Sequence, residues 1–401
     1  MTSDAGRPTL GVGIVGYAFM GAAHAHAWRT AQHMFDLPLT PAMVAICGRD
    51  AAAVRAAADR QGWASAETDW RALIARDDID LVDICTPGDS HAEIAIAALD
   101  AGKHVLCEKP LANTPAEAEA MTAAAERAVA RGIRAMVGFN YRRGPALALA
   151  RKLVADGRLG AIRHVRAAYL QDWLTDPSFP LTWRLQRDRA GSGALGDLGA
   201  HVIDLAQYLT GEPINAVSGS TTTFVTERPL PGPAATTAAS TPASTPARGL
   251  VTVDDAATFS ARIGAAGTLG TFEVTRFAAG RKNALRIELN GELGSIAFDL
   301  ERLNELLFHD HTADPLTAGF TRVLVTEPGH PYLSAWWPPG HVLGWDVTFS
   351  HQVADLVRAI ADGTDIRPSF ADGLQVQRVL AAVQASAADN SAWSPVPTTA
   401  P

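Results

Sequence analysis

The chain has 401 residues, of which 47% are hydrophobic and 19% are charged, and its formal net charge is −8 at pH 7. This composition describes an ordinary globular protein and excludes a disordered or fibrous one. The negative charge gives no electrostatic reason to expect nucleic acid or an anionic membrane as a partner. Since a chain this long exceeds the size at which one hydrophobic core keeps growing, we expect two domains.

The cysteines and the first residues bear on where the protein works. Cys47, Cys85 and Cys107 match no CxxC or zinc spacing, and an odd number does not suit a disulfide framework. Residues 1–8 lack a basic segment followed by an apolar one, so we do not expect a secretory signal there. No run approaches the roughly 20 apolar residues that span a bilayer. We therefore expect a cytoplasmic protein without a membrane partner.

From about residue 10 to residue 139, short β-rich runs alternate with Ala-rich helical runs, which indicates βαβ units and a parallel sheet. Strands are predicted at Leu10–Val15, Met43–Cys47, Leu81–Cys85, His104–Cys107 and Ala135–Gly138. Helices are predicted at Met20–His33, Ala51–Gln61, Trp70–Ala75, His91–Ala101 and Pro115–Ala130. Because the strands are so apolar, we expect a doubly wound α/β sheet buried on both faces, in a domain of residues 1–140.

After residue 141, strands follow one another without intervening helices. A helix at Pro145–Asp156 precedes predicted strands at Ile162–Gln171, Ala216–Phe224, Ala256–Ile263, Leu269–Thr275, Ala284–Leu289 and Ser295–Asp299, and helices near Asp346–Ala361 and Gly373–Ala387 close the chain. This order predicts an α+β domain with an antiparallel sheet over residues 141–401. Residues 229–248 are nearly all Pro, Ala, Ser and Thr, which predicts a flexible loop, with a functional lid as the alternative.

A glycine-rich turn after the first predicted strand carries the nucleotide signal. It reads Gly16-Tyr17-Ala18-Phe19-Met20-Gly21 and opens a helix, so its backbone N–H groups would face a pyrophosphate. Ala18 occupies the position where a glycine normally lets the backbone approach the phosphates most closely. A tight strand–helix turn without a ligand is the alternative interpretation.

The end of the second predicted strand bears on the type of cofactor. A small residue, Gly48, is followed there by Arg49 and Asp50. Arginine after a small residue suits the 2′-phosphate of NADP, whereas an acidic residue would hold the ribose hydroxyls of NAD. Asp50 either caps the next helix or reaches a ribose, so we expect NAD(P) with NADP favoured over NAD.

Polar residues follow two further strands at the same edge of the predicted sheet. Thr86, Pro87 and His91 follow the strand that ends at residue 85, and Glu108 and Lys109 follow the strand that ends at residue 107. Open α/β sheets bind ligands at the carboxyl ends of their strands, so we expect all five residues at the cofactor. A helix cap is the alternative for His91, and a solvated surface position is the alternative for Lys109.

Asp197 and His201 are four residues apart in a segment predicted to be helical, so both side chains would share one face of that helix. An apolar stripe on the same segment would pack inward and leave Asp197, His201 and Asp204 facing a cleft. Two carboxylates and a histidine are also possible metal ligands, but nothing nearby completes such a site, so we expect no metal.

Taken in order, these motifs resemble the Gfo/Idh/MocA family, which includes glucose–fructose oxidoreductase and inositol dehydrogenases. The resemblance rests on Gly16-x-Ala18-x-x-Gly21 with His24, Thr86-Pro87 with His91, Glu108-Lys109-Pro110, and Gly193-x3-Asp197-x-Gly199-x-His201. It implies a Rossmann domain and an α+β domain with a large open, mainly antiparallel sheet, often used for oligomerisation, hence a homodimer or homotetramer. It also implies nicotinamide-dependent oxidation of sugars or cyclitols. Ala18 departs from the family pattern, which bears on cofactor affinity rather than cofactor class.

The same resemblance implies roles for three residues. His201 would accept the proton of the reacting hydroxyl, Lys109 would hydrogen-bond the substrate oxygen, and Asp197 would hold a substrate hydroxyl or orient its neighbours. A second group of residues offers the hydrogen-bonding groups and apolar rings that a polyol substrate needs: Asn140, Tyr141, Asp172, Trp173, Trp183 and Arg184.

We therefore expect an NAD(P)-dependent dehydrogenase that acts on a secondary alcohol of a sugar, anhydrosugar, glycoside or inositol. A ketoreductase in sugar metabolism is one alternative. A sugar- or dinucleotide-sensing regulator without turnover is the other, because fold alone does not decide function.

Overall fold

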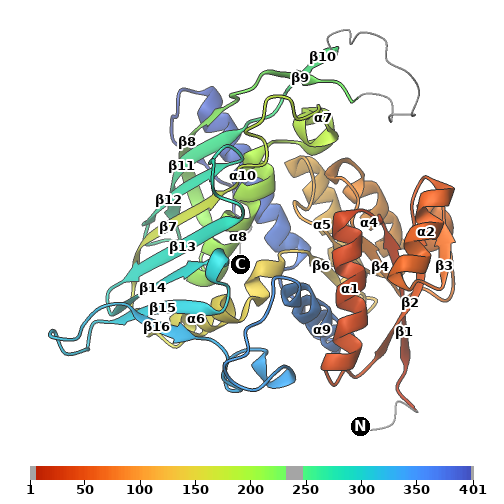
Figure 1. Cartoon of the computed structure of the whole chain (residues 1–401), viewed down its shortest axis with the longest axis horizontal. Helices are drawn as coiled ribbons and strands as arrows, with labels where there is room; N and C mark the ends of the chain where they lie inside the picture. The colour runs from red at the N-terminus through yellow and green to blue at the C-terminus, as the bar shows by residue number, and fades with distance from the viewer. Residues whose placement is uncertain (1–5, 232–246, 399–401) are drawn as a thin grey trace.

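The structure, a computed structural model, describes residues 6–231 and 247–398. A six-stranded and a nine-stranded sheet lie on opposite sides of the molecule, with several helices between them (Figure 1). This arrangement confirms the predicted fold class of a Rossmann sheet joined to an α+β unit. Among the described helices, none is long and apolar enough to cross a membrane.

The first sheet is parallel throughout, with the strand order β3-β2-β1-β4-β5-β6. Its strands are β1 (Thr9–Val15), β2 (Thr40–Cys47), β3 (Ser65–Glu67), β4 (Leu81–Ile84), β5 (His104–Cys107) and β6 (Ala135–Val137). Its helices are α1 (Phe19–Met34), α2 (Ala51–Gln61), α3 (Trp70–Ile74), α4 (His91–Asp100) and α5 (Pro115–Val129). The strand order reverses between β1 and β4, and doubly wound sheets bind ligands at such a switch point.

Local sequence explains how these helices begin. Asp50 accepts hydrogen bonds from two backbone N–H groups of α2 and therefore caps that helix. Thr114 and Glu117 form a capping box at the start of α5. In α1, by contrast, Ala18 supplies no side-chain cap and the first turn contains no acidic residue. The first N–H groups of α1 are therefore available to an anion.

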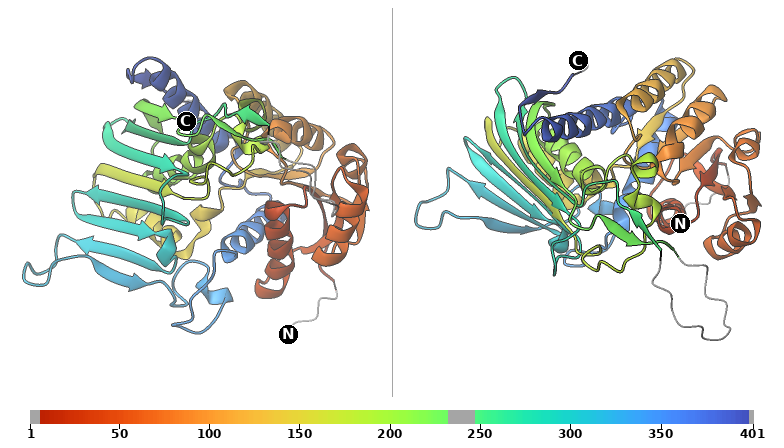
Figure 2. Two further views of the ribbon diagram at one scale, coloured as in Figure 1. Left: turned by 45° about the horizontal axis from the view of Figure 1, so that its top comes forward. Right: turned by 90° about the horizontal axis from the view of Figure 1, so that it is seen from above.

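The second sheet has the order β16-β15-β14-β13-β7-β12-β11-β8-β17, and only the pair β7–β12 among the described strands of this sheet is parallel. Its strands are β7 (Ile162–Leu170), β8 (Ile214–Thr222), β11 (Ala256–Ile263), β12 (Thr268–Thr275), β13 (Ala284–Gly291), β14 (Gly294–Asp299), β15 (Glu305–Asp310), β16 (Thr321–Leu324) and β17 (Ser394–Pro395). Helices α6 (Pro145–Ala155), α8 (Ala200–Thr210) and α10 (Phe370–Ala388) cover one face of it. The right panel of Figure 2 shows the other face free of helices in the part of the chain that is described.

One C-terminal segment packs against the N-terminal sheet. Helix α9 (Val347–Asp362) runs beside α1, and its Phe349 and Val353 are buried in the same hydrophobic cluster as Trp28. Met136 of β6 also forms a β-bridge with Ser369. Part of the predicted second domain therefore completes the packing of the first, while the boundary near residue 140 stays a prediction.

The loop predicted at residues 229–248 is wrong at its two ends. Strand β9 (Glu227–Pro229) pairs antiparallel with β10 (Arg248–Leu250), so Pro229 and Arg248 are opposite each other in a two-stranded ribbon. The backbone of these flanking residues finds partners in the ribbon, which a loop would not provide. Residues 232–246, the remainder of the predicted loop, lie outside the described residues.

Candidate active site

Three charged side chains from different parts of the fold meet at Asp197. Lys109, which follows β5, places Nζ 2.9 Å from Asp197 Oδ1 and 3.0 Å from its backbone oxygen. Arg276, which follows β12, donates to Asp197 Oδ2 at 3.0 Å. Although desolvation acts to raise it, Lys109 and Arg276 hold the pKa of Asp197 well below its ordinary value. Asp197 is therefore ionised and held by one cation from each sheet.

His201, in the first turn of α8, is buried among aromatic rings. The centres of its ring and of the rings of Tyr141, Tyr169 and Phe139 are 4.6, 5.8 and 6.2 Å apart, respectively. Burial, and after it the charge of Lys109, hold the pKa of His201 well below 6.5. The imidazole is therefore neutral at pH 7 and able to accept a proton.

The segment that carries Asp197 and His201 differs from the predicted single α-helix. Leu195–Gly199 form a π-helical turn, and α8 begins only after it, so the i, i+4 geometry of an α-helix does not relate the two side chains. Asp204, expected beside them, is buried in an ion pair with Arg142 at 2.6 Å. Asp204 is therefore not in the predicted cleft, and the Asp–His–Asp metal interpretation loses its third ligand. Asp197 and His201 still lie close enough for the Asp197 charge to act on the imidazole.

Asp254 fixes the start of this π-helical turn. Its carboxylate accepts hydrogen bonds from the backbone N–H groups of Gly193 and Leu195 at 2.8 and 2.7 Å. Gly193 leaves no room for a side chain, because a Cβ there would lie 1.7 Å from the Asp254 carbonyl oxygen. Single-turn π-helices often occur at functional sites, and here the turn places Asp197 between its two cations.

A chain of hydrogen bonds extends from the aromatic rings around His201. The hydroxyl oxygens of Tyr141 and Tyr169 are 3.0 Å apart, and Tyr169 donates to Asn283 Oδ1 at 2.6 Å. Gln171 donates to the same oxygen at 2.8 Å and accepts from Trp173 Nε1 at 2.9 Å. Ring faces next to ordered polar groups are the surface that a polyol needs.

Three of the residues predicted to bind substrate lie near this charged cluster. Tyr141 contacts His201, and the Trp173 ring lies 5.2 Å from the Arg276 guanidinium. Arg184 is exposed and covers the Trp183 ring at 4.5 Å. Desolvation lowers the pKa of Arg184, with Asp197 acting in the opposite direction. The charge of Asp197 therefore acts on the Arg184 guanidinium.

Two other predicted substrate residues have partners elsewhere. Asn140 is buried and donates to the Thr348 hydroxyl of α9 at 2.8 Å. Asp172 accepts hydrogen bonds from Lys282 Nζ at 2.8 Å and from a neighbouring backbone N–H. These contacts tie loops and helices together, and a substrate contact of either residue stays a prediction.

Sequence reasoning missed Arg276, Asn283 and Asp254. None of them belongs to a recognisable motif, and each meets the site only because strands far apart in sequence end at the same edge of the large sheet. For Arg276, the signal that could have found it is a charge directly after an alternating strand pattern. For Asp254, it is the pair of carboxylates, Asp254 and Asp255, that precedes such a pattern.

The glycine-rich turn has the tight geometry of a phosphate-binding turn. Gly16 has φ +110°, and a Cβ there would lie 2.7 Å from the Cys85 carbonyl oxygen. A Cβ on Gly21 would lie 2.1 Å from the Gly16 oxygen, so the helix begins directly against the strand. Ala18 and Phe19 are exposed and Met20 is half-buried. Free helix N–H groups behind such a turn fit a dinucleotide pyrophosphate.

Phe19 connects this turn to the second half of the molecule. Its ring stacks on Trp345 with the ring centres 5.8 Å apart, and Trp345 Nε1 donates to the Tyr141 hydroxyl at 3.3 Å. Trp345 therefore connects the turn predicted to bind cofactor with the rings around His201, because it contacts both Phe19 and Tyr141.

The residues that follow β2 bear on the type of cofactor, and the exposed charged side chain that caps no helix there is Arg49. Tyr17 packs on Gly48, where a Cβ would lie 2.1 Å from the tyrosine ring. Asp50 is occupied as the cap of α2. Arg49 is exposed and forms no ion pair with any described residue.

His91 joins two of the strand ends predicted to face the cofactor. Its Nε2 lies 2.9 Å from the Thr86 carbonyl oxygen and its Nδ1 lies 3.0 Å from that of Pro110. The ring is buried, so these contacts hold the segments after β4 and β5 together. A direct cofactor contact of His91, Thr86 or Pro87 stays a prediction.

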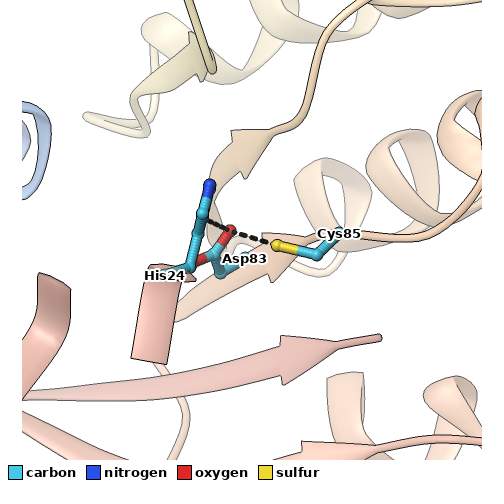
Figure 3. Close-up of side chains that lie close together, drawn as sticks. All are labelled: His24, Asp83 and Cys85. Atoms are coloured by element: carbon cyan, nitrogen blue, oxygen red, sulfur yellow. Dashed lines mark hydrogen bonds and ion pairs between the residues drawn. The ribbon is translucent and has the colours of Figure 1, made fainter. Parts of the chain in front are cut away.

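His24, Asp83 and Cys85 lie close enough together to be considered as a metal site (Figure 3). However, both Asp83 oxygens already contact His24 Nδ1, at 2.9 and 3.0 Å. Burial raises the pKa of the Cys85 thiol, which is the opposite of what a thiolate ligand needs. The three groups satisfy one another and do not fit a metal.

Family models match both halves of the chain. A model described as "Oxidoreductase family, NAD-binding Rossmann fold" matches residues 10–139, and one described as "GFO/IDH/MocA C-terminal domain" matches residues 147–297. The chain belongs to the Gfo/Idh/MocA oxidoreductase family. The predicted family is thus confirmed, together with an NAD-binding Rossmann domain in an oxidoreductase.

Relatives within this family match along nearly the whole chain. Levoglucosan dehydrogenase from Pseudarthrobacter phenanthrenivorans is 43% identical over 97% of this chain and 98% of its own length. A crystal structure of an oxidoreductase domain protein from Kribbella flavida is 64% identical, with a TM-score of 0.92 over 97% of this chain and 100% of its own. A levoglucosan dehydrogenase structure in complex with NADH and levoglucosan is 42% identical, with a TM-score of 0.90 over 98% and 100% of the two chains.

Proposed function

We propose that this Gfo/Idh/MocA protein is an NAD(P)-dependent dehydrogenase that oxidises a secondary alcohol of a sugar or anhydrosugar. The observation that carries the proposal is the neutral, buried His201 beside an ionised Asp197 that Lys109 and Arg276 hold. That site contains a base, a cationic hydrogen-bond donor and a polyol-binding surface. The names of its relatives, levoglucosan dehydrogenase and inositol 2-dehydrogenase, support the same class of substrate.

When bound, an oxidised nicotinamide supplies the acceptor for the hydride of the alcohol carbon. Lys109 donates a hydrogen bond to the reacting oxygen and stabilises the negative charge that develops on it. His201 accepts the hydroxyl proton because its imidazole is neutral at pH 7. Asp197 fixes the Lys109 ammonium group, and its charge favours the imidazolium that forms. The aromatic rings around His201 exclude water from the proton-transfer step.

Levoglucosan is the first substrate to test, followed by other anhydrosugars, aldoses, glycosides and inositols. The assay follows nicotinamide reduction with NAD⁺ and NADP⁺ offered separately. Turnover that requires His201 supports the proposal. Absence of turnover across the panel, with cofactor binding intact, contradicts the dehydrogenase proposal and favours a sensing role.

For the cofactor, we propose NADP with a modest preference over NAD. Arg49 follows β2 and pairs with no carboxylate in the described part of the chain, whereas Asp50 is occupied as a helix cap. Three levoglucosan dehydrogenase structures are complexes with NADH, so the preference is a property of this chain to be measured. Arg49→Gln should raise the Kd for NADP by about tenfold, the loss of one charge-assisted hydrogen bond, and leave that for NAD unchanged. An equal effect on both cofactors contradicts this role.

We also propose that the enzyme is cytoplasmic and forms a homodimer or homotetramer. Its three cysteines are all free thiols, which suits a reducing compartment. The uncovered face of the large sheet is the surface through which copies would associate (Figure 2).

A further inference from the structure

A buried cluster next to Lys109 takes no part in the mechanism above. His24 of α1 lies between the carboxylates of Asp83, on β4, and Glu108, which follows β5. Its Nδ1 is 2.9 and 3.0 Å from the two Asp83 oxygens, and its Nε2 is 2.9 Å from Glu108 Oε1. The exposed fractions are only 1% for His24, 0% for Asp83 and 5% for Glu108. Figure 3 shows the His24 ring directly against Asp83.

The positions of these atoms determine the charge on His24. A neutral imidazole donates from one nitrogen only, and an ionised carboxylate cannot donate to the other. Only a doubly protonated ring satisfies both carboxylates at once. Burial opposes this charge, but Asp83 and Cys85 together outweigh it and raise the pKa of His24 well above its ordinary value.

Within the described residues, the other side chains that contact the cluster are uncharged. Trp28 Nε1, also on α1, donates to Asp83 Oδ2 at 2.8 Å. The Cys85 thiol lies 3.6 Å from Asp83 Oδ1, and the Phe349 ring of α9 lies 5.3 Å from the His24 ring. Two carboxylates and one imidazolium therefore face one another without a further ion, so removing the imidazolium leaves both carboxylates uncompensated.

Glu108 connects the cluster to the active site. Its Oε1 faces His24, and its Oε2 accepts the backbone N–H of Lys109 at 3.2 Å. Gly138 leaves room for the same carboxylate, because a Cβ there would lie 2.7 Å from Oε1. The Lys109 side chain then extends to Asp197. The orientation of the Glu108 carboxylate therefore affects the position of the Lys109 backbone, from which the lysine side chain extends.

We propose that Asp83, His24 and Glu108 form a positioning network that directs Lys109 toward Asp197. The network touches neither Asp197 nor His201 and acts only through the peptide unit of Lys109. Its kinetic test rests on the proposed function, whereas the position of Lys109 can be tested without turnover.

The test compares two substitutions that each remove one donor to Asp83. His24→Gln also removes the contact with Glu108, whereas Trp28→Phe leaves that contact intact. Both residues are fully or almost fully buried on α1, so both variants should lose thermal stability. Only His24→Gln should disturb Lys109. If His24→Gln does not fold, Glu108→Gln tests the same network, because it changes the carboxylate that contacts both His24 and the Lys109 backbone.

Two measurements report on Lys109 in these variants. Its acetylation rate with acetic anhydride, read by mass spectrometry against the exposed Lys152, should rise in His24→Gln and stay at the wild-type value in Trp28→Phe. The kcat should fall about 10²-fold in His24→Gln, as for a catalytic group displaced by about 1 Å, with KM and cofactor Kd nearly unchanged.

The outcomes separate positioning from simple stability. If both variants lose kcat in proportion to their loss in Tm while Lys109 stays protected, the network is merely structural and the proposal is overturned. If the wild type turns over no sugar but Lys109 becomes reactive in His24→Gln, the proposed function fails and the positioning network stands.

The charge on His24 has its own test. A histidine whose pKa is raised on folding adds stability that is complete below pH 6.5 and is lost as the pH rises through the folded-state value. The Tm difference between wild type and His24→Gln should therefore be larger at pH 6 than at pH 9 and above. A Tm difference that is larger at pH 9, or the same at both, contradicts a charged His24.

Discussion

His201 combines two properties that a general base needs, a neutral ring and a position against the aromatic rings of the proposed substrate site. Replacing it by glutamine should lower kcat by about 10²–10⁴-fold, the usual contribution of a positioned base, and leave the Kd of the cofactor unchanged. The matched control is His104→Gln. Burial lowers the pKa of His104 too, to about 4, and His104 lies at the start of β5, the end of the strand away from Lys109. An equal loss of kcat in both variants would show that His201 is not special to the reaction.

The lowered pKa of His201 also predicts the pH dependence of the reaction. A base with a pKa held below 6.5 stays active until the pH falls below that value, and activity is lost only on further acidification. The acid limb of a kcat/KM profile should therefore lie below pH 6.5 for a sugar that does not itself titrate. An acid limb at pH 7 or above, measured with saturating cofactor, would contradict the neutral buried imidazole.

At the level of secondary structure, the sequence predicts elements better than it predicts their contacts. The strands Ala256–Ile263 and His104–Cys107 have the predicted bounds, because their hydrophobic patterns end at clear turn residues. The π-helical turn at Leu195–Gly199 could not be predicted, since the spacing of Asp197 and His201 is the same in an α-helix. Nothing local to the sequence distinguishes the two kinds of helix.

The same contrast between local pattern and tertiary contact applies to the site residues. Lys109 and Asp197 belong to short motifs, and the structure places them in contact. Arg276 has no motif around it, and its ion pair with Asp197 depends on β12 ending beside the π-helical turn. Asn140 has the right chemistry for a sugar and donates one amide hydrogen bond to Thr348 of α9, so its substrate contact stays a prediction. Residue type alone does not reveal which side chains the fold has already occupied.

Arg276 is the residue that the large sheet contributes to the candidate active site. Arg276→Met removes one of the two cations that hold Asp197, and with a buried ion pair broken we expect kcat/KM to fall about 10- to 100-fold. Arg228→Met is the matched control, since Arg228 is equally buried but contacts backbone carbonyls away from Asp197. Loss of activity in both variants to the same degree would point to stability rather than to Asp197.

For the whole molecule, the site depends on how the two sheets are joined. Lys109 comes from the parallel sheet and Arg276 from the nine-stranded sheet, and the two side chains meet only at Asp197. Helix α9 strengthens this arrangement by packing against α1 although it belongs to the C-terminal part of the chain. Catalytic geometry in this fold is therefore a property of the docked halves, and neither half contains it alone.

The uncovered face of the large sheet predicts self-association. Ion pairs such as Arg166–Glu288 and Arg286–Asp299 surround a shallow hollow of about 470 Å³ on this face. Sheets with one face uncovered by helices need either solvent-compatible residues or a partner, and a polar, hollowed face suits a hydrated interface between copies. We expect sedimentation to give a dimer or tetramer at micromolar concentration.

Two arginines placed at the centre of this face should dissociate that assembly. Thr271→Arg combined with Glu273→Arg adds two bulky cations that project from the same side of β12, because alternate residues of a strand share a face. The control, Glu126→Arg combined with Ala130→Arg, places two arginines on the exposed surface at the C-terminal end of α5, where Ala130 is the C-cap. Only the sheet variant should sediment as a monomer. Since Asp197 and its two cations all come from one chain, the monomer should keep the cofactor affinity of the wild type, and an unchanged assembly in the sheet variant would place the interface on another surface.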